Sequence, residues 1–268
     1  MKLSVEFPSV SYREGPAAVA DLARAIERIG YDHIDIFDHV VMGVPIEGRA
    51  RGPYNPQMPI LEALMALSYM AAVTTRVTLG TEVLVLPQRQ PALVAKQVST
   101  LDTLSGGRVR LGVGVGWQES EYEALGEPFG TRGPRMDEAI RLMRAYWSDA
   151  EVTVPSPHYP TLSMAMEPKP PQGARLPIWI GGLSEAAGRD PQAIGLQSMV
   201  APPPRDAAGK TFYADHAQVV ARVAALKAMG FGWVALNATA IFQAGARSVA
   251  AMTEELHRLH DRIRAEVG

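Results

Sequence analysis

The sequence predicts a parallel α/β fold, a TIM-type (β/α) barrel. Short apolar strands alternate with helical segments along the chain, and its 268 residues are close to the usual size of one such barrel. Residues 77–86 are rich in β-branched and apolar side chains, which is typical of a strand covered by helices on both faces. We therefore expect a single β/α barrel domain over residues 1–268.

The predicted strands are short and apolar, and several end in polar residues or glycines. The second strand ends in Asp38-His39, and the strand that begins at Pro177 ends in Gly181-Gly182. The run Trp233 to Asn237 is the last strand before the C-terminal helix. The strands are expected at residues 3–7, 34–37, 77–86, 109–115, 177–180, 193–200 and 233–237.

The helices are indicated by apolar residues three or four positions apart. Leu22, Ile26 and Ile29 share one face of the first helix, and Gly30 occupies the place of a C-terminal cap. Pro59 opens the second helix, because proline is tolerated in a first turn. The helices are expected at residues 17–29, 59–73, 91–104, around 136–147, 215–229 and 249–263, with irregular stretches at 40–58 and 151–177.

One β/α unit is not visible in the pattern after residue 182. Residues 182–192 leave no room for the helix, strand and helix that an eighth unit needs. An open barrel would expose strand edges, which proteins normally cover. We therefore expect either a homodimer or a local rearrangement near residues 183–200.

Composition and charge narrow the functional classes. The net charge of −2 gives no basic excess for nucleic acid, and no apolar run is long enough to cross a membrane. The N-terminus resembles a strand and not a signal peptide, so we expect a cytoplasmic protein. The absence of cysteine excludes disulfides, thiolate nucleophiles and thiolate metal sites.

The residues that carry chemistry gather at the predicted carboxyl ends of the strands, where β/α barrels place their active sites. They are Asp38-His39, Glu82-Val83, the glycine-rich run that ends in Gly116-Trp117, and Gly181-Gly182. Glycines also end strands for structural reasons alone, so the clustering by itself does not define a site.

The resemblance to a known family rests on three stretches. Residues 36–39 (IFDH) resemble the end of the second strand in luciferase-like monooxygenases and in their relatives that use the deazaflavin coenzyme F420. Residues 75–126 (TRVTLGTEVLVLPQRQPALVAKQVSTLDTLSGGRVRLGVGVGWQESEYEALG) resemble the family's third strand, third helix and fourth strand in unbroken register. Residues 177–182 (PIWIGG) are similar to the fifth strand, and the likeness weakens after residue 182.

The resemblance assigns roles at the second and third strands. It implies that His39 faces the reactive ring of the cofactor, where an imidazole can exchange a proton near pH 7. It also implies that Asp38 bonds the cofactor, although a helix cap is an alternative for this residue. Glu82-Val83 matches the place where the family often has a non-proline cis peptide bond behind the ring. The family commonly has a small residue at position 82, so Glu82 is a departure from its pattern. Four roles are open for this side chain: it donates a proton, contacts the cofactor, narrows the pocket, or faces solvent.

Further cofactor contacts are expected along the fourth and fifth strands. Gly112, Gly114 and Gly116 form G-x-G-x-G and not the nicotinamide-binding G-x-G-x-x-G, so we expect them to let a ligand approach the backbone. Trp117 either stacks near a ring or packs under the next helix. A glutamate stands at that position in relatives that oxidise a sugar phosphate, so that activity is not expected here. The remaining predicted contacts are Ser120 by resemblance, and Gly181, Gly182 and Ser184 as a phosphate site, while Glu121-Tyr122 is assigned to the scaffold.

The leading hypothesis is hydride transfer between F420 and a small organic substrate, with His39 and Glu82 as catalytic residues. Residues 40–58 and 151–177 are expected to frame the substrate pocket, with Met42 and Tyr54 among its lining. The alternatives are an FMNH2-dependent monooxygenase and a shortened barrel that has lost cofactor binding. A metal-dependent hydrolase is discounted, because strand alternation puts His33 and Asp35 on the face opposite Asp38.

Overall fold

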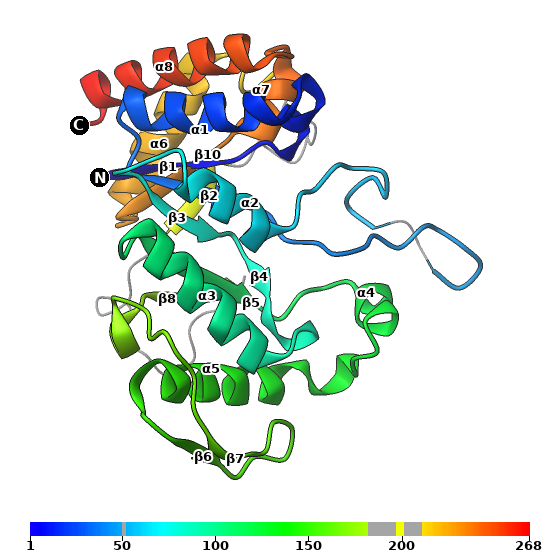
Figure 1. The fold of residues 1–268 in the computed structure, drawn as a ribbon. Helices are drawn as coiled ribbons and strands as arrows, with labels where there is room; N and C mark the ends of the chain where they lie inside the picture. Colours follow the sequence, from blue (N-terminus) through cyan, green and yellow to red (C-terminus); the bar gives the residue numbers. More distant parts are fainter. Residues whose placement is uncertain (50–51, 182–196, 201–210) are drawn as a thin grey trace. The chain divides into compact units, whose positions relative to one another are not determined.

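The computed structural model describes residues 1–49, 52–181, 197–200 and 211–268. The chain forms two compact units. Unit 1 comprises Met1–Ile36, Val73–Leu79 and the described residues from Gln197 onward, and unit 2 comprises Phe37–Ala72 and Gly80–Gly182. Each unit contains parallel strands and its own helices (Figure 1).

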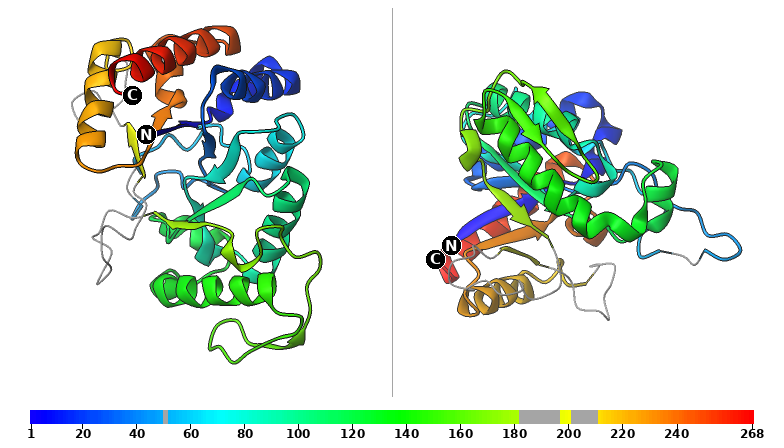
Figure 2. Two further views of the ribbon diagram at one scale, coloured as in Figure 1. Left: turned by 90° about the vertical axis from the view of Figure 1, so that its left-hand side faces the viewer. Right: turned by 90° about the horizontal axis from the view of Figure 1, so that it is seen from below.

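The described strands of unit 1 run parallel, and each is hydrogen-bonded to the strand beside it. Strand β1 (Lys2–Glu6) lies between β2 (His33–Ile36) and β10 (Trp233–Asn237), and β10 also pairs with β9 (Gln197–Val200). Figure 2 shows β1 and β10 side by side. The helices are α1 (Pro16–Ile29), α6 (His216–Ala228), α7 (Ala238–Ala244) and α8 (Val249–Glu266), with a 3-10 turn at Ser9–Glu14.

The ends of the helices in unit 1 follow from local side chains. Helix α1 begins at Pro16 and ends at Gly30, whose left-handed conformation directs its N–H to the Ile26 carbonyl, as the sequence predicts. Asp215 caps α6 by accepting from the Ala217 and Gln218 N–H groups. Helices α1 and α8 pack against each other, and their apolar faces cover the sheet (Figure 1).

Unit 2 contains further parallel strands and most of the glycine-rich segments. Strand β5 (Val109–Gly114) pairs with both β4 (Leu84–Val85) and β8 (Ile178–Ile180). Its helices are α2 (Ala63–Ala71), α3 (Pro91–Ser105), α4 (Glu119–Ala124) and α5 (Arg132–Ser148), and α3 packs on α5. Strand β3 (Thr78–Thr81) begins in unit 1 and ends in unit 2, and 3-10 turns occur at Leu86–Gln88, Phe129–Thr131 and Gly173–Arg175.

Three element predictions are wrong in unit 2, each for a local reason. The helix expected from Pro59 begins only at Ala63, because the Glu62 side chain accepts from the Met65 N–H and caps it there. The strand expected at 77–86 is interrupted between β3 and β4 by a cis peptide bond at Glu82-Val83. The stretch 151–177, expected to be irregular, contains an antiparallel hairpin of β6 (Val152–Val154) and β7 (Thr161–Met164) (Figure 2).

The β/α unit predicted to be missing concerns residues 182–196, which lie outside the described residues. Within the described part of the chain, no helix has the length and apolar character needed to cross a bilayer. The same residues contain no group of three or more histidine, aspartate or glutamate side chains placed to hold a metal ion.

The interior of unit 1 contains a buried polar network on the faces of β1 and β2. His33 and Asp35 share one face, as alternation predicts, with His33 Nε2 2.7 Å from Asp35 Oδ1. Gln197 Nε2 donates to the other oxygen of Asp35 at 2.9 Å. Glu6 pairs in register with Asp35 and accepts from the N–H and hydroxyl of Thr239, both at 3.3 Å. Burial raises the pKa of Glu6 to about 8, against the opposing hydrogen bonds from Thr239.

The raised pKa of Glu6 predicts a pH-dependent stability. The unfolded glutamate titrates near pH ~4.3, so between this pH and about 8 the native state holds one more proton than the unfolded chain. The free energy of unfolding therefore falls as the pH rises through that window. Glu6→Gln removes this dependence, and its melting temperature at pH 8 should exceed that of the unaltered protein by on the order of 5 °C. At pH 5 the two proteins should melt within a degree or two of each other, by about the precision of the measurement. Exposed Glu47→Gln is the control, and an equal gain for Glu6→Gln at both pH values contradicts the assignment.

Candidate active site

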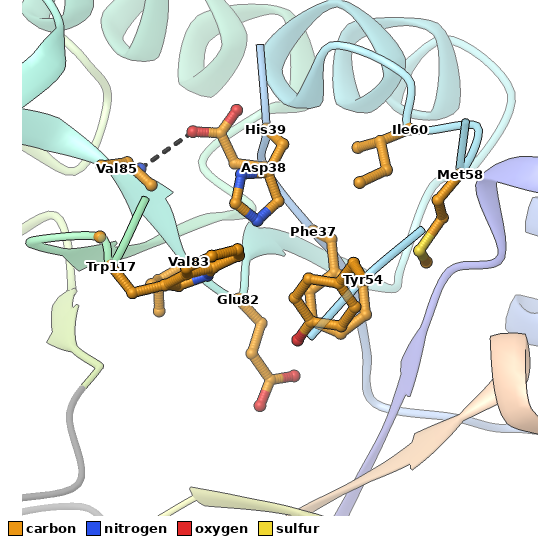
Figure 3. Close-up of a pocket in the computed structure, with 11 residues that line it drawn as sticks. Phe37, Asp38, His39, Tyr54, Met58, Ile60, Glu82, Val83, Val85 and Trp117 are labelled. Carbon is orange, nitrogen blue, oxygen red and sulfur yellow. Dashed lines mark hydrogen bonds between the residues drawn. The ribbon is translucent and has the colours of Figure 1, made fainter. Parts of the chain in front are cut away.

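A hollow of about 170 Å³ opens in unit 2 at the ends of its strands (Figure 3). Its walls come from the segment after β2, the bend between β3 and β4, and the turn after β5. Aromatic and aliphatic side chains dominate, with two carboxylates and one imidazole among them. The lining residues are Phe37, Asp38, His39, Tyr54, Met58, Ile60, Glu82, Val83, Val85, Gly116 and Trp117.

Three rings surround one corner of this hollow. The His39 imidazole forms a triangle with the Trp117 and Tyr54 rings (Figure 3), whose centroids are 5.7 Å and 6.0 Å away from its own. The Tyr54 and Trp117 centroids are themselves 6.0 Å apart. The His39 side chain is only 10% exposed, and Nε2 has no hydrogen-bond partner among the residues that the structure describes. The ring can therefore exchange a proton with a molecule in the hollow through that atom.

The other nitrogen of His39 is bound to Glu121 of α4. The distance from Nδ1 to Glu121 Oε2 is 2.9 Å, and Glu121 Oε1 accepts from the Val40 N–H at 2.6 Å and the Val41 N–H at 3.3 Å. Burial disfavours the charged carboxylate, but these hydrogen bonds outweigh it and lower the pKa of Glu121 below its ordinary value. Glu121 was assigned to the scaffold from sequence, and the structure instead places it against the predicted catalytic histidine.

Asp38 points away from His39 and is occupied by other partners. Its Oδ2 accepts from the Val85 N–H at 2.9 Å (Figure 3), and its Oδ1 pairs with the Arg89 guanidinium at 2.6 Å. Burial raises the pKa of Asp38, and the nearby Arg89 opposes that shift. The carboxylate thus fastens the segment that begins at Phe37 to β4, while its predicted bond to a cofactor stays a prediction.

The Glu82-Val83 peptide bond is cis, as the resemblance implies. Both residues line the hollow, and the Glu82 side chain extends in the opposite direction from the imidazole (Figure 3). Val83 therefore forms a wall of the hollow. The catalytic role of Glu82 and the cofactor contacts of Glu82 and Val83 stay predictions.

The glycines of β5 make room for the chain itself. A Cβ added to Gly114 would lie 2.6 Å from Val83 Cγ2, and one added to Gly112 would lie 2.0 Å from the Thr81 carbonyl oxygen. A Cβ added to Gly181 would likewise lie 2.6 Å from Val83 Cγ1. The prediction that Gly112 and Gly114 admit a ligand is therefore wrong, because Thr81 and Val83 occupy the space that these residues leave.

The remaining predicted contacts divide by position. Gly116 and Trp117 line the hollow, where Trp117 as a residue is 44% exposed and not packed under a helix. Ser120 is not a lining residue, and its Oγ faces Gly43. Gly182 and Ser184 lie outside the described residues. The cofactor contacts of Gly116, Trp117, Ser120 and Gly181 stay predictions.

The frame of the hollow was predicted in part. Tyr54 and Met58 come from the irregular stretch at residues 40–58, as expected, whereas Met42 is not among the lining residues. The stretch at 151–177 contributes no described lining residue, because it forms the β6–β7 hairpin instead. The sequence signal that would have found Glu121 is its position four residues after Trp117 on a helix that follows the glycine-rich strand.

The chain matches a family model described as luciferase-like monooxygenase over residues 2–261. It is 37% identical to an uncharacterized protein of Mycobacterium tuberculosis (strain H37Rv) over 176 residues, 63% of this chain and 60% of that protein. It is 30% identical over 198 residues to the F420-dependent glucose-6-phosphate dehydrogenase of Kribbella flavida, 70% of this chain and 55% of the relative. The chain thus matches only 55–60% of the length of these curated relatives.

Solved structures share the fold at low sequence identity. An F420-dependent secondary alcohol dehydrogenase in complex with an F420-acetone adduct superposes with a TM-score of 0.69 at 15% identity, covering 94% of this chain and 97% of that one. The monooxygenase RslO1 from Streptomyces bottropensis gives a TM-score of 0.62 at 21% identity, covering 99% and 83%. The predicted TIM-type β/α fold is confirmed by these similarities.

The parallel β/α units and the hollow at their strand ends define a protein of the β/α-barrel class. The match over residues 2–261 makes the particular assignment: the chain belongs to the luciferase-like monooxygenase family.

The packing of Val83 against Gly114 predicts a steric defect in Gly114→Ala. A new methyl group 2.6 Å from Val83 Cγ2 must displace a β-branched side chain with few rotamers, so the free energy of unfolding should fall by about 1–3 kcal/mol. Urea denaturation measures this change. Gly133→Ala is the control, since nothing lies within 4 Å of its added Cβ and alanine favours the helix.

The double variant Gly114→Ala with Val83→Ala separates this clash from a general effect of alanine in β5. Removing the Val83 methyl groups frees the space, so the double variant should lose less stability than the sum of the two single variants. Full additivity of the two changes would show that Val83 and Gly114 do not meet.

Proposed function

We propose that this chain is an oxidoreductase that transfers a hydride between F420 and a small organic substrate, with the reactive ring held in the hollow of unit 2. The observation that carries the proposal is the His39 imidazole, which lies beside two aromatic rings in the hollow with its Nε2 edge available. The curated relative from Kribbella flavida supports F420, because it is named as F420-dependent at 30% identity.

The lining of the hollow fits a flat conjugated ring. Val83, Val85 and Gly116 offer a smooth apolar wall, and the Trp117 and Tyr54 rings offer faces and edges that favour aromatic partners. The volume of about 170 Å³ is below the ~300 Å³ of a pocket for a whole drug-sized ligand, so it suits the ring portion of a larger cofactor. The phosphate-bearing part would need the predicted contacts at Gly181, Gly182 and Ser184.

When bound, F420 supplies two-electron redox chemistry through its C5 carbon. Oxidation of an alcohol breaks one C–H and one O–H bond and forms a C=O bond, so a proton leaves the substrate together with the hydride. His39 accepts that proton at Nε2 in the oxidative direction and returns it in the reductive direction. The surrounding rings exclude water from the imidazole, which is 10% exposed.

The substrate class follows from the same walls. Apolar side chains at Phe37, Met58 and Ile60 favour a small, largely apolar molecule. The sugar-phosphate oxidation named for the Kribbella flavida relative is not part of the proposal, because Trp117 stands where the resemblance places a glutamate.

We also propose the homodimer and the cytoplasmic location that the sequence leads us to expect. Light scattering of the purified protein tests the homodimer.

Titration with F420 and FMN, each oxidised and reduced, tests the cofactor. Tryptophan fluorescence should be quenched by F420, because Trp117 lines the hollow, and the affinity for FMN should be at least about tenfold lower, a difference of ~1.4 kcal/mol. Tight binding of FMN alone would indicate a flavin monooxygenase instead. Binding of neither cofactor would indicate a shortened barrel without redox activity.

The role of His39 predicts a selective loss of turnover. In His39→Gln the proton acceptor is removed, so kcat of F420-linked oxidation should fall by about 100-fold or more, while the affinity for F420 changes by only a few-fold. Steady-state kinetics and the fluorescence titration measure the two quantities. Exposed His158→Gln is the control and should behave like the unaltered protein. A kcat within a few-fold of the unaltered value in His39→Gln would remove His39 from the mechanism.

A further inference from the structure

Within the described residues, the polar contacts of the Glu121 side chain are all directed at three consecutive residues. Its carboxylate accepts from His39 Nδ1, the Val40 N–H and the Val41 N–H, at 2.9, 2.6 and 3.3 Å. The side chain is 2% exposed, so water does not replace these partners. Glu121 therefore binds the Nδ1 edge of His39, and the Nε2 edge is left for the hollow.

The hydrogen bonds determine which nitrogen of His39 carries the proton. The pKa of Glu121 lies below its ordinary value, so the carboxylate is ionised at neutral pH and can only accept hydrogen bonds. His39 Nδ1 must then be the donor in the 2.9 Å contact. In a neutral imidazole only one nitrogen is protonated, so Nε2 keeps its lone pair toward the hollow.

Helix α4 cannot readily follow a movement of His39, because it is fastened by side chains on either side of Glu121. Gln118 Nε2 donates to the Val41 carbonyl at 2.8 Å, and Gln118 Oε1 accepts from the Gly43 N–H at 3.2 Å. The Tyr122 hydroxyl donates to the Val115 carbonyl at 2.6 Å. These bonds place Glu121 at a defined distance from His39 before any ligand binds.

We propose that Glu121 is a positioning residue that holds His39 in the Nδ1–H tautomer, so that Nε2 is the atom that exchanges a proton with the substrate. This inference rests on the proposed function for the identity of the reaction. The orientation of the imidazole and its tautomer do not depend on which redox cofactor binds. A structural tie for residues 40–43 would need only the backbone hydrogen bonds, and the bond to Nδ1 is the additional contact that points to catalysis.

The variant Glu121→Gln reverses the hydrogen-bond chemistry with little change in shape. Its single amide oxygen is taken by the Val40 and Val41 N–H groups, so its NH2 group faces His39 Nδ1. A donor at this place requires Nδ1 to accept, and the proton moves to Nε2. The matched control is Glu123→Gln on the same helix, where the Glu123 side chain is 74% exposed and is bonded to Arg49 at 3.2 Å.

Nitrogen NMR of the full chain with 15N-labelled histidine reads the tautomer without any cofactor. The His39 signals are assigned by their loss in His39→Gln. The spectra are recorded at a pH where the imidazole is neutral. There the unaltered protein and Glu123→Gln should show the Nδ1–H form, and Glu121→Gln should show the Nε2–H form. Circular dichroism and thermal melts establish that Glu121→Gln is folded, and Glu121→Ala gives a second variant if it is not.

The kinetic consequence is a loss of turnover with little loss of binding. With a proton on Nε2, His39 cannot accept the substrate proton, so kcat of Glu121→Gln should fall by about 100-fold. KM and the affinity for F420 should change by less than about threefold, because Glu121 touches neither ligand in the proposed site. Glu123→Gln should keep the kcat of the unaltered protein.

The outcomes separate this inference from the proposed function. An Nε2–H tautomer in the unaltered protein, or an unchanged tautomer in folded Glu121→Gln, overturns the positioning role even if F420 is reduced. Failure to bind F420 overturns the proposed function, and the tautomer measurement then still decides whether Glu121 sets the proton position of His39.

Discussion

The insertion of Val83 between two glycines is the constraint on which the geometry of unit 2 depends. Strands β4, β5 and β8 meet where the Val83 side chain approaches Gly114 and Gly181, and either position would clash with it if it carried a Cβ. The same valine forms a wall of the hollow. The close packing of the sheet and the shape of the site are therefore set by one contact, because protein interiors leave no spare space for a side chain to move into.

Two adjacent residues after β2 are held by two different carboxylate arrangements. Asp38 is itself the carboxylate and pairs with Arg89 and the Val85 N–H, whereas His39 is bound by the carboxylate of Glu121. The pKa of Asp38 is raised since its burial dominates, and the pKa of Glu121 is lowered since three N–H donors outweigh its burial. The hydrogen bonds of these two carboxylates hold the backbone at residues 38–41. They leave the Nε2 edge of His39 directed at the hollow.

Unit 1 uses buried polar groups differently. Its Glu6, His33 and Asp35 lie on neighbouring strands and satisfy one another or Thr239 and Gln197. The pKa of about 8 for Glu6 shows the cost of keeping a carboxyl group in that interior, because burial disfavours its charged form more than two hydrogen bonds can offset. The sequence pattern revealed only that His33 and Asp35 share a face, since strand alternation is a local property and the network is not.

The sequence by itself determined the alternation of strands and helices, the cap at Gly30, the family, and the cis peptide position at Glu82-Val83. These features depend on local periodicity, cap chemistry or an unbroken motif, which a linear pattern carries. Only the tertiary structure decided that Gly112 and Gly114 accommodate Thr81 and Val83, and that Glu121 lies behind His39. Those contacts join residues about 30 and 80 positions apart, and no local pattern specifies which distant side chain fills a given space.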